Sequence, residues 1–178
     1  MADATPQSAR PAGGRWSRLA GLGLAGSALA VLGVAAWLQP EAAGVGTHTG
    51  LGLSPCGFLQ ATGLPCATCG MTTATSLAAH GRLLAAAATQ PAGLLFALAL
   101  GGLVWLGGWL ACSGRPAGPV LAGLSRVVFS GRGLLAALVI VGGSWVYKAA
   151  RMAAADGSSA PWSAALPASP APEAVPGG

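Results

Sequence analysis

Three of the four cysteines in this 178-residue chain lie close together, and their spacing is suited to two kinds of chemistry. Nine residues separate Cys56 from Cys66, and two separate Cys66 from Cys69. The resulting C-x-x-C pair can hold one soft metal ion or form a redox-active disulfide. The sequence also predicts a short helix from about Cys69 to His80. That helix would place Cys69 in its first turn, where the helix dipole lowers the pKa of a thiol.

The only histidines, His48 and His80, lie in the same segment as these cysteines. A zinc site formed by Cys56, Cys66, Cys69 and His80 is therefore one hypothesis. No second C-x-x-C occurs in the chain, so the pattern favours the absence of a cofactor over zinc. Three alternatives stay open: a disulfide among the three cysteines, thiol redox chemistry by Cys66 and Cys69, and a structural role for reduced cysteines.

Other catalytic groups are scarce. The four carboxylates are spread along the chain and form no pair for acid–base work, which favours a non-enzymatic role; they are Asp3, Glu41, Asp156 and Glu173. The net charge of +5 does not predict nucleic-acid binding, because the nine basic residues lie at the ends of apolar runs. We expect Cys112, at the end of one such run, to be a small apolar packing residue.

The composition is that of an integral membrane protein. Only 7% of the residues are charged and 53% are hydrophobic, so the chain lacks the polar surface that a water-soluble domain of this size needs. Residues 19–38 contain no charge and are long enough to cross a bilayer as a helix. We therefore predict an all-α fold in the lipid bilayer, with about three transmembrane helices and a short helix after the cysteine-containing loop.

The predicted organisation consists of seven segments. They are a disordered tail at 1–18, a first transmembrane helix at 19–38, the cysteine loop with its short helix at 39–91, a second transmembrane helix at 92–112, a connector at 113–126, a third transmembrane helix at 127–147, and a disordered Ala/Pro-rich tail at 148–178. The boundaries follow from Pro40, which ends a helix, and from Pro91, which is well placed to begin one. Small residues at four-residue spacing, such as Gly21 and Ala25, suit close helix packing.

The distribution of basic residues predicts the orientation. With the N-terminus in the cytoplasm, six basic residues are inside and three are outside. The inner six are Arg10, Arg15, Arg18, Arg115, Arg126 and Arg132, and the outer three are Arg82, Lys148 and Arg151. This orientation in the cell membrane places the cysteine loop outside the cytoplasm, where disulfides persist.

The motif around the cysteines resembles that of a bacterial membrane family, the domain of unknown function 2752 family. The residues that carry the resemblance are Cys56-Gly57-Phe58, Thr62-Gly63-Leu64-Pro65-Cys66-Ala67-Thr68-Cys69-Gly70-Met71-Thr72, His80-Gly81 and Gln90-Pro91 before an apolar run. The family pattern reads Cys-Pro-Phe, then Gly-x-Pro-Cys-Pro-x-Cys-Gly-x-Thr-Arg, then Asn-Pro before a helix. The resemblance implies structural roles for Gly63, Pro65, Gly70, Thr72, Gly81 and Pro91, and it implies no reaction.

Several residues depart from this pattern. Gly57 and Ala67 replace prolines, and Gln90 replaces an asparagine. Thr73 stands where the family usually has an arginine. If that arginine stabilises a thiolate or binds an anion, this chain has either lost the role or transferred it to Arg82.

These observations lead to one hypothesis and two alternatives. The hypothesis is a non-enzymatic membrane protein whose cysteine loop, pinned by a disulfide or a metal, contacts another membrane protein or a second copy of the chain. The first alternative is thiol redox or metal handling by Cys66 and Cys69. The second is a component of an oligomeric transporter, which is disfavoured because the apolar runs contain no acidic residue to line a polar pathway.

Overall fold

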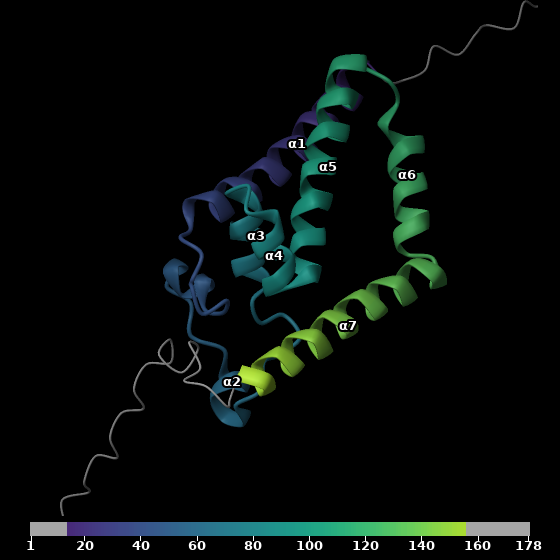
Figure 1. Cartoon of the computed structure of the whole chain (residues 1–178). Coiled ribbons are helices and arrows are strands. Elements are labelled where there is room, and N and C mark those ends of the chain that lie inside the picture. The colour runs from purple at the N-terminus through teal and green to yellow at the C-terminus, as the bar shows by residue number, and fades with distance from the viewer. Residues whose placement is uncertain (1–13, 156–178) are drawn as a thin grey trace, which may run out of the picture. The chain divides into compact units, whose positions relative to one another are not determined.

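A computed structural model of the chain describes residues 14–155 and confirms an all-α fold, with no strand among these residues. The elements shown in Figure 1 are α1 (Gly14–Trp37), the 3-10 helix η1 (Thr47–Leu51), α2 (Gly57–Thr62), α3 (Met71–Ala79), α4 (Leu83–Thr89), α5 (Pro91–Ser113), α6 (Ala117–Val128) and α7 (Gly131–Ala155). The disorder expected at 1–13 and 156–178 concerns residues outside this described range. Residues 14–18 and 148–155, which were also expected in the tails, lie in α1 and α7.

Three of these helices are long and apolar enough to cross a membrane, as predicted. They are Gly14–Trp37, Pro91–Ser113 and Gly131–Ala154. Their surfaces expose many large apolar side chains, including Leu29, Leu98 and Leu138. Exposed apolar surface of this kind suits contact with lipid, because a bilayer core solvates it without the cost that water imposes.

The region between the second and third long helices differs from the expected connector. Residues 117–128 form α6, since Pro119 lies in its first turn, where a missing backbone donor costs nothing. The third long helix then begins at Gly131 rather than at residue 127. Ser130 caps its N-terminus: the Ser130 hydroxyl accepts a 3.0 Å hydrogen bond from the backbone N–H of Gly133.

The chain divides into two compact units. The first contains the residues up to Ala30 and Leu100–Leu134. Within it, α1 and α5 cross closely at Gly21 and Gly107: a Cβ on Gly21 would lie 2.6 Å from the Gly107 carbonyl oxygen, and a Cβ on Gly107 would lie 2.6 Å from the Gly21 carbonyl oxygen. Only glycine permits this approach, so the predicted small-residue face of Gly21 and Ala25 is a real packing surface.

The second unit contains Val31–Ala99 and the chain from Leu135 onward. Helices α3 and α4 lie side by side in it (Figure 1), and their buried residues Ala74, Leu77 and Ala86 form one apolar cluster. Gly81 ends α3 with a φ of 77°, in the left-handed conformation predicted for it. The cysteine loop lies in this unit.

Candidate functional site

The two cysteines of the C-x-x-C lie in a turn before α3, not inside the helix. The backbone N–H of Cys69 binds the carbonyl of Cys66 at 3.0 Å, and Gly70 then turns the chain with a φ of 85° before α3 begins at Met71. The expected start of the helix at Cys69 is therefore wrong. A glycine in the left-handed conformation interrupts the backbone there, so the first turn of α3 contains no cysteine.

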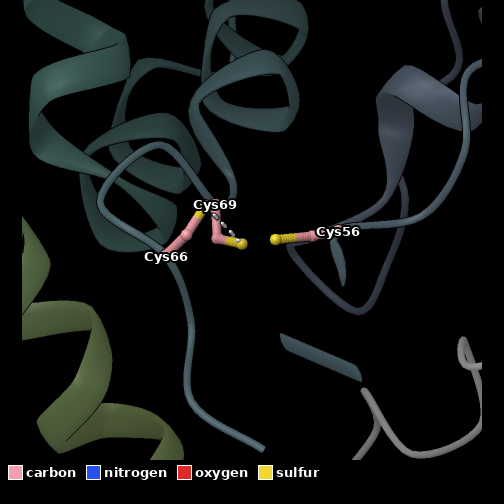
Figure 2. A group of neighbouring side chains, drawn as sticks. All are labelled: Cys56, Cys66 and Cys69. Carbon is pink, nitrogen blue, oxygen red and sulfur yellow. Dashed lines mark hydrogen bonds between the residues drawn. The ribbon is translucent and has the colours of Figure 1, made fainter. Parts of the chain in front are cut away.

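The structure brings the three predicted cysteines together. The sulfur atoms of Cys56, Cys66 and Cys69 all lie within 4.8 Å of one another. Figure 2 shows the Cys56 side chain directing its sulfur toward the Cys66–Cys69 pair, in which the two sulfurs are 3.1 Å apart. Cys69 is buried and the other two are half-buried. All three thiols are free, and three soft donors at such separations can bind a metal ion.

The surroundings shift the pKa values of Cys66 and Cys69 in opposite directions. Burial by itself raises the pKa of Cys66, but hydrogen bonds from the Thr68 hydroxyl, the Cys69 thiol, the Thr68 backbone N–H and the Cys56 thiol lower it to about 7. Burial and the hydrogen bond to Cys66 raise the pKa of Cys69 to about 12. The pKa of Cys69 is thus raised rather than lowered as expected, and Cys66 is the residue that forms a thiolate near neutral pH.

The histidines do not join the cysteines. Nδ1 of His80 lies 2.8 Å from the carbonyl oxygen of Ser76 in its own helix, and Nε2 of His48 lies 3.2 Å from that of Ser54. Between residues 14 and 155, the group of three or more metal-ligand side chains close enough to share an ion consists of the three cysteines alone. His80 is therefore not placed as the fourth ligand. The chain order could not reveal this, because which side chains converge depends on how the turns fold.

The motif residues with predicted structural roles occupy turns and helix ends. Gly63, Gly70 and Gly81 all have positive φ, which favours glycine. Pro65 is buried, and Pro91 is the first residue of α5. Thr72 is half-buried in the first turn of α3.

Two other residues differ from the expected picture. Cys112 is exposed near the end of α5, so the expected packing role is wrong for this residue. Thr73, where the resemblance led us to expect an arginine, is fully buried, and its hydroxyl lies 2.8 Å from that of Thr47. Arg82 is exposed, ahead of α4.

Sequence reasoning missed the contribution of α7. Four side chains in its second half donate hydrogen bonds to backbone carbonyls of the segment between the first two long helices. They are Trp145 to Pro65 at 2.8 Å, Tyr147 to Ala88 at 3.1 Å, Lys148 to Gly44 at 3.0 Å, and Arg151 to Ala88 at 3.3 Å. The signal in the sequence was the sudden run of hydrogen-bond donors after a long charge-free stretch.

These contacts are compatible with membrane crossings by all three long helices, since α5 and α7 together return the chain to the side of the cysteine segment. Three crossings put the segment after the first helix and the end of the third helix on the same side of the membrane. The hydrogen bonds from α7 to Pro65, Ala88 and Gly44 require that same placement.

Residues 56–105 match the family described as protein of unknown function (DUF2752). The resemblance drawn from the cysteine motif is thereby confirmed. The DUF2752 match begins at Cys56 and ends at Trp105 within α5, so it contains the three cysteines and excludes α7 with Lys148. No curated protein matches the chain, and no solved structure matches it.

Proposed function

We propose that this membrane protein is a non-enzymatic structural or interaction module, and that one divalent metal ion, zinc by preference, pins its cysteine loop. The observation that carries the proposal is the convergence of three sulfurs within 4.8 Å. A disulfide uses only two sulfurs and leaves no reason for Cys56 to join the pair. Tetrahedral zinc with Zn–S bonds of about 2.3 Å places its sulfurs about 3.8 Å apart, which three thiols at these separations can reach with small rotations.

The metal would stabilise a part of the chain that has little core of its own. The apolar cluster around the site contains four buried residues, Val45, Leu59, Cys69 and Met152. So small a core contributes little hydrophobic free energy, and a bound ion that links Cys56 to the C-x-x-C turn would supply the missing stability. Three protein ligands leave the fourth tetrahedral position for a water molecule or for a donor from a partner.

The proposed module faces out of the cytoplasm and contacts another membrane component. The orientation is supported by the six-to-three distribution of basic residues. Contact with a partner is supported by large apolar side chains that the cysteine loop leaves exposed, among them Leu53, Phe58 and Leu64. A topology reporter fused after Gly46 tests the orientation. Activity of a reporter that works only in the cytoplasm would show the opposite orientation and contradict this part of the proposal.

The decisive experiment for the metal is elemental analysis of the full chain purified in detergent without chelator. We expect about one zinc per chain in the wild type and in Cys112→Ser, and loss of the metal in Cys56→Ser, Cys66→Ser and Cys69→Ser. Cys112→Ser is the matched control because its thiol is exposed and distant in sequence from the motif. Metal-free wild-type protein whose Cys56 and Cys66 react readily with an alkylating agent before reduction would overturn the proposal.

A second candidate function is thiol–disulfide exchange, favoured by the pKa difference within the pair. The Cys66 thiolate would attack one sulfur of a disulfide in a partner protein, forming a mixed disulfide and releasing a partner thiolate that takes up a proton. Cys69 would then lose its proton and attack Cys66, closing the Cys66–Cys69 disulfide and releasing the second partner thiol. Two electrons pass to the partner. A mixed disulfide that accumulates in Cys69→Ser, but not in Cys66→Ser, would favour this candidate over the metal.

A further inference from the structure

Lys148 is a buried cation inside the second half of α7. Its side chain exposes only 7% of its surface, and its ammonium donates a 3.0 Å hydrogen bond to the carbonyl oxygen of Gly44. An ammonium has three donors, and burying its charge is unfavourable unless an anion lies nearby. The position of Lys148 therefore calls for a negative partner.

The carboxylates of the described residues do not provide that partner. Between residues 14 and 155 the only acidic side chain is that of Glu41, which is exposed and forms no salt bridge with Lys148. The hydrogen bond to the Gly44 carbonyl satisfies one N–H and compensates only part of a full charge.

The cysteine turn is the neighbour of Lys148 that can carry negative charge. A Cβ on Gly70, the residue after Cys69, would lie 3.2 Å from Nζ and 3.5 Å from Cε of Lys148. Because Gly70 directly follows Cys69, the ammonium of Lys148 lies beside the turn that contains Cys66 and Cys69. Met152, one turn further along α7, packs in the same buried cluster as Cys69. The helix thus presents its one buried cation to the three-cysteine site.

We infer that Lys148 is the counter-charge of the metal complex at Cys56, Cys66 and Cys69. This inference rests on the proposed function and adds a charge count to it. Three thiolates contribute −3, a divalent ion +2 and the Lys148 ammonium +1, so the buried complex is neutral. Without Lys148, the same complex carries one uncompensated negative charge in a buried position, and a neutral complex is reached only with two thiolates. Lys148 is therefore a positioning residue that acts through the ligands.

The test uses Cd²⁺ as the probe on the full chain in detergent, after reduction and removal of metal. Titration is followed by the thiolate-to-cadmium absorption, whose intensity per bound ion reports the number of thiolates. The variants are Lys148→Met, which keeps the length and loses the charge, and Lys148→Arg, which keeps the charge. Arg132→Met is the matched control, because Arg132 is an exposed cation near the other end of the same helix. Cys56→Ser calibrates the two-thiolate intensity.

We expect Lys148→Met to bind Cd²⁺ about 10- to 100-fold more weakly than the wild type, as for other residues that support metal ligands. We also expect its absorption per bound ion to fall to the level of Cys56→Ser. Lys148→Arg should recover the three-thiolate intensity, and Arg132→Met should match the wild type. Circular dichroism of each variant verifies that the helices are intact.

Two results would overturn the inference. One is a folded Lys148→Met protein that binds Cd²⁺ with wild-type affinity and three-thiolate intensity. The other is equal loss of binding in folded Lys148→Met and Lys148→Arg, since that outcome assigns Lys148 a packing role without charge. Failure of the wild-type chain itself to bind Cd²⁺ through three thiolates is a different result, because it removes the proposed metal site and this inference together.

Discussion

Substitution of Gly70 by alanine should loosen the cysteine site far more than the same change at Gly63. Both glycines have positive φ, 85° at Gly70 and 70° at Gly63. An alanine at either position therefore raises the backbone conformational energy of the folded state by a similar amount, about 1 to 2 kcal/mol. Their surroundings differ. A Cβ on Gly70 would lie 2.7 Å from the carbonyl oxygen of Gly44, whereas a Cβ on Gly63 meets nothing within 4 Å. Gly63→Ala therefore measures the backbone penalty alone.

The additional cost at Gly70 comes from the carbonyl that must move. The Gly44 carbonyl accepts the hydrogen bond from Lys148, and a hydrogen bond to a charged group contributes about 1.5 to 3 kcal/mol. We expect the free energy of unfolding of Gly70→Ala to fall below that of Gly63→Ala by about this amount. Combining Gly70→Ala with Lys148→Met should shrink the difference, because the bond is already absent in that background.

The assay is equilibrium unfolding in a mild detergent with increasing denaturing detergent, followed by tryptophan fluorescence and circular dichroism. Maleimide labelling of Cys69, which is buried, gives an independent measure of opening at the site itself. Equal destabilisation by Gly70→Ala and Gly63→Ala, with unchanged labelling of Cys69, would refute the placement of Gly70 against Gly44 and Lys148.

Three further predictions concern the cysteine thiols and two other close contacts of glycines. In reduced, metal-free protein the rate of Cys66 alkylation should rise with pH through a midpoint near 7, because its pKa is about 7 and only the thiolate reacts. Cys69, with a pKa of about 12, should react slowly at that pH. Peptide mass spectrometry distinguishes the two cysteines, and faster labelling of Cys69 would contradict the assignment. Gly93→Ala should destabilise the second unit by about 1 to 3 kcal/mol, since the added Cβ would lie 2.7 Å from that of Ala74. The control is Gly101→Ala in the same helix, whose added Cβ meets open space. This control should be neutral or slightly stabilising in the unfolding assay. Gly107→Ala should likewise destabilise the α1–α5 crossing by about 1 to 3 kcal/mol, whereas Gly108→Ala, at the neighbouring position, should not. Equal unfolding curves for these two variants would count against the close approach of Gly107 to Gly21.

The membrane character and the long helices could be predicted because they depend on composition and on local chain order. The charge-free run beginning at Leu19 and the position of Pro91 determine where a helix can cross lipid and where it can begin, whatever the rest of the chain does. The turn at Gly81 was predictable for the same reason, since the left-handed conformation favours glycine locally. The Ser130 cap was equally local and was missed because we placed the start of the third helix by length alone.

The sequence by itself therefore determined that this is a membrane protein, that it has three long apolar helices, and that Cys56, Cys66 and Cys69 are the cysteines that could do chemistry. Only the tertiary structure decided that Cys56 joins the C-x-x-C pair, that His80 stays apart, and that Lys148 lies beside the turn. These are relations between residues up to 104 positions apart, as in the bond from Lys148 to Gly44. Such relations depend on how turns and helices pack in three dimensions, which neither residue spacing nor hydrophobic pattern encodes.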